Sequence, residues 1–183
     1  MQIDNHAVTP VALPVESGVC HIYKMTNLAD AYAIQLPKGT TTNPELLARF
    51  IFSQQSPWIS GLMRVRDAVV AGFGLKTSGE LMKADSVGRA NRIGIFKVYS
   101  TSTHEIILGE DDKHLDFRLS LLYQAQPSAM SSPRLVLSTV VHCHNRLGRR
   151  YIFFIAPFHR LIVQSTLRRA SRIGWPKATS TWT

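Results

Sequence analysis

The strongest pattern along this chain is a strict alternation of apolar and polar residues that begins at position 114. The apolar set occupies every second position: Leu115, Phe117, Leu119 and Leu121. The polar set fills the positions between them: His114, Asp116, Arg118 and Ser120. Because successive side chains of a β-strand point to opposite faces, this alternation predicts a strand over residues 114–124. We expect its apolar face to point into a core. Its polar face then either points outward to solvent, which the alternation favours, or forms the polar floor of a pocket.

Short apolar runs bounded by turn residues predict four further strands. These runs cover residues 31–36, 92–100, 105–108 and 134–144. The connections among the later strands are short and turn-like. We therefore expect these strands to be antiparallel neighbours.

Helical patterns follow the first strand and close the chain. Asn43 and Pro44 start a helix that ends near Gln54, because a polar cap followed by proline is typical of a helix N-terminus. Apolar residues at helical spacing predict a second helix that ends at Gly72: Trp58, Leu62, Val65 and Val69. A long helix is expected over 147–172. Pro157 should kink or split it, because proline removes a backbone donor.

Segregated helices and a run of strands predict a single α+β domain over residues 26–173. Residues 1–25 are interpreted as an irregular N-terminal segment, and 174–183 as a tail. We expect a curved antiparallel sheet folded round the long C-terminal helix. A two-helix corner should follow the first strand. A sheet curved in this way often leaves a cavity next to the helix.

Composition is that of an ordinary globular domain, but the charge is unevenly distributed. The chain has 183 residues, 45% hydrophobic and 18% charged, and a net charge of +9. All 12 acidic residues lie at or before Asp116, whereas residues 117–183 carry ten basic residues and no acidic one. This asymmetry favours anionic lipid or nucleic acid as a partner, or it reflects a solvated helix face. Nucleic acid is the less expected partner, because interleaved exposed aromatic residues are lacking.

A cytoplasmic location is expected. The first residues lack the basic and apolar regions of a secretory signal, and reduced thiols are expected at Cys20 and Cys143. No apolar run approaches the ~20 residues that cross a bilayer.

Several motifs in combination resemble a bacterial family, the one filed as domain of unknown function 2867. The resemblance covers residues 26–172 and is carried by these segments: Pro57-Trp58, 62–67, Gly74-Leu75, 109–118, 139–142, His144-Asn145, 147–149 and 157–160. It implies a helix-grip fold similar to birch-pollen allergens and START-like lipid-transfer proteins. Such folds commonly hold an apolar ligand between sheet and helix. The family has no established activity, so the resemblance implies no catalytic residue.

Two groups of polar residues could carry chemistry. On the strand at 114–124, Arg118 could hold a carboxylate or phosphate, and His114 could exchange a proton. The alternative is a surface strand whose acid and base pair along the sheet. His142 and His144 share one side of the last strand, a spacing that zinc can use. A third ligand would have to come from elsewhere, so we expect no metal and no cofactor.

The long helix carries an apolar stripe with aromatic residues in its first half: Leu147, Tyr151, Phe154, Ile155, Phe158, Leu161, Ile162 and Leu167. We expect these side chains to pack on the sheet. The same side chains would line a cavity wherever the sheet curves away from the helix. Tyr151 and His159 would then supply polar contacts.

Three functional hypotheses follow. The first is a module that binds a small apolar or amphipathic ligand between sheet and helix, with these candidate contacts: Leu115, Phe117, Leu119, Tyr151, Phe154, Phe158, His114, Asp116, Arg118 and His142. The second is an enzyme, which requires His114, Asp116 and His142 to converge in one cleft. The third is an interaction protein whose basic C-terminal face binds anionic lipid or nucleic acid. Ligand identity, reaction and oligomeric state do not follow from the sequence.

Overall fold

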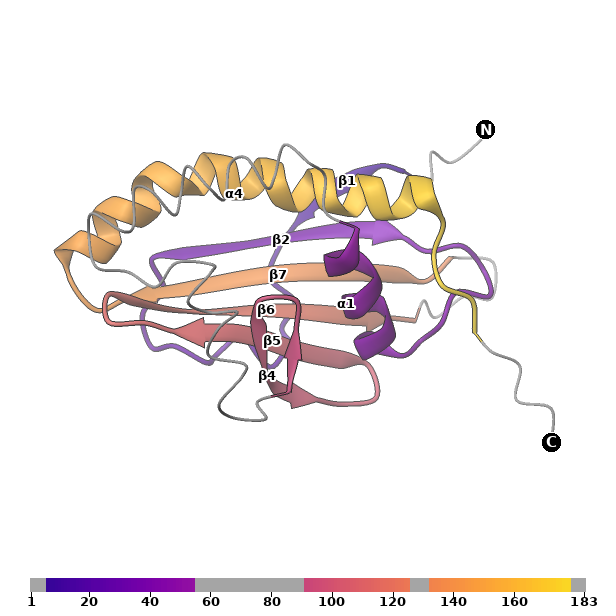
Figure 1. Ribbon diagram of the computed structural model, residues 1–183, viewed down its shortest axis with the longest axis horizontal. Coiled ribbons are helices and arrows are strands. Elements are labelled where there is room, and N and C mark those ends of the chain that lie inside the picture. Colours follow the sequence, from indigo (N-terminus) through magenta and orange to yellow (C-terminus); the bar gives the residue numbers. More distant parts are fainter. Residues whose placement is uncertain (1–5, 55–90, 126–131, 179–183) are drawn as a thin grey trace.

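A computed structural model of the chain describes residues 6–54, 91–125 and 132–178 (Figure 1). Within them, strands form one seven-stranded antiparallel sheet in the order β1-β2-β7-β6-β5-β4-β3. The strand bounds are β1 (Val8–Val11), β2 (Leu28–Gln35), β3 (Arg92–Ile93), β4 (Phe96–Thr101), β5 (Glu105–Asp111), β6 (Leu115–Gln124) and β7 (Arg134–Cys143). Two helices are described, α1 (Pro44–Ser53) and α4 (Arg146–Ile173).

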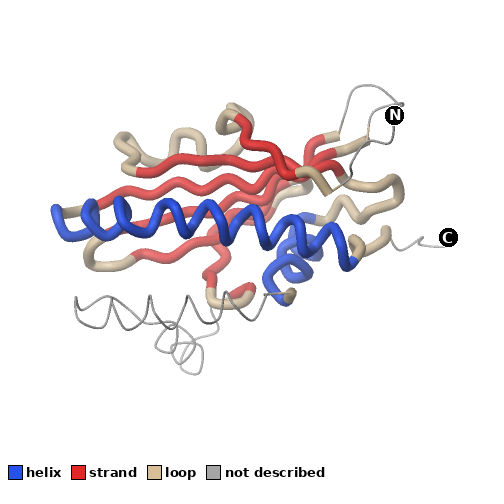
Figure 2. Tube along the Cα trace, turned by 90° about the horizontal axis from the view of Figure 1, so that it is seen from above, coloured by secondary structure: helices blue, strands red, loops and turns tan. Residues whose placement is uncertain are grey.

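The expected α+β architecture is confirmed, with the long C-terminal helix lying along one face of a curved antiparallel sheet (Figures 1 and 2). This arrangement is consistent with a helix grip. The α4 helix contacts β1, β2 and β7, and the shorter α1 contacts β3, β5 and β6. We call the face of the sheet that meets these helices the helix face. The second helix of the expected corner lies outside the described residues.

The apolar side of β6 points to the helix face, as its alternation predicts. Leu119 and Leu121 belong to the main core cluster together with Leu167 of α4, and all three are buried. Leu115 joins a second cluster with Ile152, near the beginning of α4. The order of residues along β6 thus decides which side of the sheet the helix covers.

The α1 helix begins as its sequence predicts. The side chain of Asn43 accepts hydrogen bonds from the backbone N–H groups of Glu45 and Leu46, and Pro44 occupies the first turn. These contacts satisfy N–H groups that have no partner inside the helix. Leu47 and Ile51 then point into the core.

The α4 helix is one continuous element that contains Pro157, so of the kink or split that we expected there, the split is not found. Its sheet-facing side also differs from the predicted stripe. The buried residues are centred on Ile152, Val163, Leu167 and Ala170. Phe154, Phe158 and Leu161 are exposed instead, because they project from the opposite side of the helix. The aromatic content of the stripe suggested a core position, but the burial of small and β-branched residues sets the helix rotation.

The N-terminal segment, which we interpreted as irregular, contains strand β1 and covers the other face of the sheet, called here the outer face. Leu13 and Tyr23 pack on Val140, and Val19 is buried beside Ile107. The expectation that the polar side of β6 meets solvent is therefore wrong. Both Arg118 and Ser120 lie on this outer face and are buried.

Residues after α4 also pack on the domain, although we expected a tail from residue 174. Trp175 is buried in the main core cluster, and its ring lies 6.0 Å from that of Phe50. Lys177 forms a β-bridge with Thr40. The end of α4 is thereby held to the segment that precedes α1.

Candidate functional site

A small polar cluster lies between α4 and the helix face of the sheet. Asp30 of β2 stands directly opposite Thr139 of β7, so both side chains lie on one face. His159 of α4 approaches Asp30, with its Nε2 atom 3.4 Å from Oδ1 of the carboxylate. Nε of Arg160 lies 3.7 Å from the other carboxylate oxygen. The side chain of Asp30 is only 12% exposed.

Four buried polar atoms of this cluster have no hydrogen-bond partner among the described residues. They are both carboxylate oxygens of Asp30, Nε2 of His159 and Oγ1 of Thr139. Buried polar atoms are normally paired, because the loss of hydration without a replacement hydrogen bond is costly. The cluster therefore offers hydrogen-bond acceptors inside an apolar interface, together with the Nε2 atom of His159, which can donate or accept. It is the part of the helix face best suited to meet a polar group of a ligand.

Apolar side chains border this cluster toward the beginning of α4. Phe117 is half-buried and packs against both core clusters. It meets Phe96 edge to face, with ring centroids 6.0 Å apart, and Phe96 meets Phe52 at 5.0 Å. Tyr151 of α4 packs on the same second cluster and is also half-buried. These partly exposed rings form an apolar wall next to the polar cluster.

The candidate ligand contacts on β6 and α4 are only partly brought together. Leu115 and Leu119 are buried core residues, and Phe117 and Tyr151 belong to the apolar wall. Phe154 and Phe158 do not belong to it. Their exposed fractions are 68% and 48%, on the side of α4 that points away from the sheet.

Arg118 lies on the outer face, in a clamp with two tyrosines and an aspartate. Its exposed fraction is 8%, and Nη2 is 2.7 Å from Oδ1 of Asp111. The guanidinium lies over the rings of Tyr99 and Tyr23, at 3.6 and 5.9 Å from their centroids. The hydroxyl of Tyr99 donates to the other oxygen of Asp111 at 2.7 Å. This clamp joins β4, β5 and β6 to the N-terminal segment.

The clamp depends on Gly109, which stands opposite Arg118 on β5. A Cβ atom at Gly109 would lie 2.2 Å from the carbonyl oxygen of Phe117 and 2.9 Å from Cδ of Arg118. Only glycine therefore leaves room at this position for the aliphatic part of the Arg118 side chain, which passes over β5. The Nη1 atom of Arg118 then donates to the carbonyl of Phe117 at 2.8 Å.

The ionisation of the clamp follows from burial and from its charges. Burial raises the pKa of Tyr23 to about 12, against an opposing effect of Arg118. Burial and the hydrogen bond to Asp111 raise the pKa of the Tyr99 phenol well above its usual value. Burial opposes ionisation of Asp111, but the hydrogen bonds from Arg118 and Tyr99 outweigh it and lower the pKa of that carboxyl. At neutral pH the clamp thus contains one buried cation, one anion and two neutral phenols.

Of the three residues that the enzyme hypothesis requires, Asp116 and His142 are neighbours, but His114 is directed to another partner. His142 stands opposite Asp116 on the outer face, and its Nδ1 atom donates to the carbonyl of Met25 at 2.8 Å. Asp116 instead lies 3.0 Å from Nε2 of His144. His114 is turned toward α4, where Nδ1 meets the amide of Asn145 at 2.9 Å. Among the described residues no group of three side chains is arranged to hold a metal ion.

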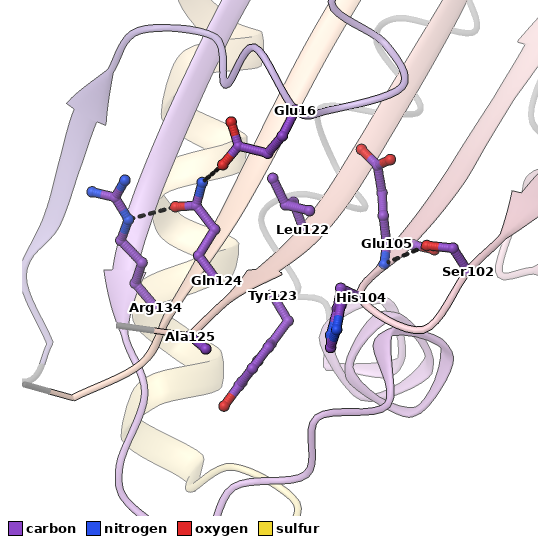
Figure 3. Close-up of a pocket in the computed structure, with 9 residues that line it drawn as sticks. All are labelled: Glu16, Ser102, His104, Glu105, Leu122, Tyr123, Gln124, Ala125 and Arg134. Atoms are coloured by element: carbon purple, nitrogen blue, oxygen red, sulfur yellow. Dashed lines mark hydrogen bonds between the residues drawn. The ribbon is translucent and has the colours of Figure 1, made fainter. Parts of the chain in front are cut away.

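A pocket of about 520 Å³ opens at the edge of the sheet where β6 ends and β7 begins (Figure 3). Leu122, which forms part of its lining, belongs to an outer-face cluster with Leu13, and no residue of α4 lines the pocket. Several of its polar side chains are hydrogen-bonded within the protein. Glu105 accepts hydrogen bonds from Ser17 and Ser120 at 2.5 Å each. Gln124 bridges Glu16 and Arg134. These bonds anchor the N-terminal segment to the sheet.

Sequence reasoning named His159 as a polar contact but missed Asp30 and Thr139. The sequence offered one weak indication of Asp30. It directly precedes the predicted strand at 31–36 and is the only acidic residue between positions 28 and 36. Tyr23 and Tyr99 were also missed. They lie far from Arg118 in sequence, and no local spacing connects them to it.

A family profile described as protein of unknown function (DUF2867) matches residues 22–166. The chain belongs to this family. The resemblance found in the sequence is thereby confirmed at the level of the DUF2867 family, whereas the START-like superfamily and the bacterial origin stay predictions. Comparisons with curated proteins and with solved structures gave no match. Within the described part of the chain, no helix is long and apolar enough to cross a membrane.

Proposed function

We propose that this protein binds a small amphipathic molecule between α4 and the helix face of the sheet. The observation that carries the proposal is the cluster of Asp30, Thr139 and His159, whose buried polar atoms lack hydrogen-bond partners among the described residues of an otherwise apolar interface. Ligand sites are typically apolar with a few convergent polar groups. A cytoplasmic location is part of the same proposal and is supported by two free cysteines, Cys20 and Cys143.

The polar end of the ligand is a hydrogen-bond donor. A carboxylate accepts hydrogen bonds and repels another carboxylate, so Asp30 favours a hydroxyl, amine or amide N–H over an acid. The hydroxyl of Thr139 and the ring of His159 can accept or donate a second bond. The apolar end is assigned to Phe117 and Tyr151, because these half-buried rings pack on the cluster of Leu28 and Val141, which neighbour Asp30 and Thr139 on the same face of β2 and β7.

Apolar burial accounts for the affinity, and the polar cluster accounts for the orientation and the choice of ligand. Each Å² of apolar surface removed from water contributes about 25 cal/mol, less the cost of ordering the ligand. A hydrogen bond to a charged group contributes about 1.5–3 kcal/mol. Loss of that bond therefore weakens binding by about tenfold or more.

The test uses the fluorescence of N-phenyl-1-naphthylamine, a neutral apolar probe with one N–H donor, and its displacement by decanol or decanoate. Wild-type protein should bind the probe, and decanol should displace it better than decanoate. Asp30→Asn should weaken decanol binding about tenfold and reduce its advantage over decanoate. Glu45→Gln is the matched control, because Glu45 is a carboxylate of α1 whose partner is Arg49 at the surface.

A second pair of variants tests the apolar wall. Tyr151→Ala should weaken probe binding, whereas Phe153→Ala should leave it unchanged, because Phe153 is 76% exposed and lies two positions away on another side of α4. Absence of probe binding to the wild type, or equal effects of Asp30→Asn and Glu45→Gln, would overturn the proposal.

A further inference from the structure

The side of α4 that points away from the sheet carries large apolar side chains. The exposed fractions are 76% for Phe153, 68% for Phe154, 48% for Phe158 and 58% for Leu161. Residues 154, 158 and 161 share one side of a helix, since they are spaced by four and three positions. Ile152, which is buried, is nine residues from Leu161, or two and a half turns, and so projects in the opposite direction. A cluster of this kind on a surface helix usually marks an interaction site.

The same helix is strongly cationic. It contains seven arginines and no acidic residue, and every one of these arginines is exposed: Arg146, Arg149, Arg150, Arg160, Arg168, Arg169 and Arg172. The arginines lie mainly at the two ends of the helix, and the apolar side chains lie between them. We define the four apolar residues with Arg150, Arg168 and Arg172 as the outward face of α4.

We propose that the outward face of α4 docks this protein on an anionic lipid surface. Exposed aromatic and leucine side chains enter the boundary between headgroups and acyl chains, while arginines meet lipid phosphates. A helix of 28 residues lying flat would extend for about 42 Å along the membrane. This inference is independent of the ligand proposed above, whose cluster lies on the opposite side of the helix.

The charge and the apolar side chains of this face together favour an anionic lipid surface over a second copy of the chain and over nucleic acid. A second copy of the chain would bring two sets of arginines together with no acidic residue of α4 to neutralise them. Nucleic acid would satisfy the arginines, but its backbone offers nothing to Phe154, Phe158 and Leu161. An anionic bilayer provides negative charge and an apolar interior to the same side of one helix.

Co-sedimentation with phosphatidylcholine vesicles, with and without phosphatidylglycerol, tests this proposal. The full-length protein should bind only vesicles that contain phosphatidylglycerol, and added salt should weaken binding. Phe154→Ser with Leu161→Ser should abolish it. Arg168→Gln with Arg172→Gln should weaken it by about tenfold or more.

The matched control is Lys24→Gln with Lys97→Gln. It also removes two exposed positive charges, but from the outer face, where Lys97 lies over Tyr99. This control should bind vesicles like the wild type. The Phe154→Ser/Leu161→Ser variant should unfold at the same denaturant concentration as the wild type and should still bind N-phenyl-1-naphthylamine.

Three results would overturn the proposal. The first is equal loss of vesicle binding in the α4 and control charge variants. The second is a clear loss of stability in the Phe154→Ser/Leu161→Ser variant, which would mean that the folded protein covers these side chains itself. The third is the absence of vesicle binding. In that case, binding of a single-stranded oligonucleotide would identify nucleic acid as the partner of this face. A wild-type dimer that the serine substitutions convert to a monomer would identify a second copy of the chain.

Discussion

Oδ1 of Asp30 lies 3.4 Å from Nε2 of His159, yet neither atom has a hydrogen-bond partner among the described residues. The two side chains join β2 to α4 at the centre of an apolar interface. A structural ion pair in such a place normally gains additional hydrogen bonds that repay the loss of hydration. Here the described part of the chain does not supply those bonds, which is what a site completed by another molecule requires.

Asp30→Asn should therefore leave the ligand-free protein as stable as the wild type, or make it more stable by about 1 kcal/mol. The substitution keeps the volume and removes a buried charge whose hydration is not replaced. Urea unfolding followed by circular dichroism measures the difference. A loss of about 3 kcal/mol or more would instead identify Asp30 as half of a stabilising ion pair.

Arg118→Ala should destabilise the protein by about 2 kcal/mol and release the N-terminal segment. The substitution removes the charge that Asp111 needs and the cation between Tyr23 and Tyr99. Because Asp111 is 54% exposed, the cost should be smaller than for a fully buried pair. Limited proteolysis by trypsin should cut faster after Lys24. Arg49→Ala, which breaks an exposed ion pair of α1, should change stability by less than about 1 kcal/mol and leave that cleavage rate unchanged.

Stability should fall as the pH rises from about 10 to about 12. The folded-state pKa of Tyr23 is raised from 10.0 to about 12, so folding favours the neutral phenol. The contribution is complete below the pKa of the unfolded chain and is lost as the pH passes through the folded-state value. Tyr23→Phe should reduce this alkaline loss, and absorbance at the phenolate band should show late titration in the wild type. An alkaline stability profile unaffected by the substitution would contradict the assignment.

At low pH the same clamp should lose stability through Asp111. Its pKa lies below the ordinary 3.8, because hydrogen bonds from Arg118 and Tyr99 outweigh the effect of burial. Its contribution is therefore present above the unfolded-state value and is lost as the pH falls through the folded-state value. Asp111→Asn should flatten this part of the acid profile relative to Glu45→Gln. Equal profiles for the two variants would show that Asp111 is not the group responsible.

Gly148→Ala should destabilise the protein by about 2 kcal/mol or more, although alanine is normally the better helix former. A Cβ atom at this position would lie 2.3 Å from the carbonyl oxygen of His114, so the first turn of α4 would have to move away from the turn before β6. Chemical denaturation measures the change, and Ser165→Ala in the same helix is the control. A stability gain at Gly148 would show that this contact is not tight.

The sequence predicted those features that depend on local periodicity. The alternation along β6 placed Leu119 and Leu121 on the helix face, and Asn43 with Pro44 marked the beginning of α1. Rotation of α4 was not predicted correctly, since aromatic residues on its outward face are as apolar as core residues. Only the packing of Ile152, Val163 and Leu167 on the sheet decides the rotation.

The candidate site was harder to predict because it depends on long-range pairing. The register of β2 and β7 places Asp30 opposite Thr139. The packing of α4 on the sheet brings His159 to Asp30. No spacing within the sequence brings these three residues together. The same reason explains why burial of Arg118 was missed: the tyrosine that covers it on the outer face comes from a segment that precedes the first predicted strand.

Native mass spectrometry of freshly purified wild-type protein and of Asp30→Asn tests the central claim most directly. The account predicts that wild-type protein carries a non-covalent small molecule, or takes up decanol when it is added, and that Asp30→Asn loses most of this adduct while remaining folded. The bare polypeptide mass in the wild type under both conditions, or an adduct that Asp30→Asn retains in full, would contradict it.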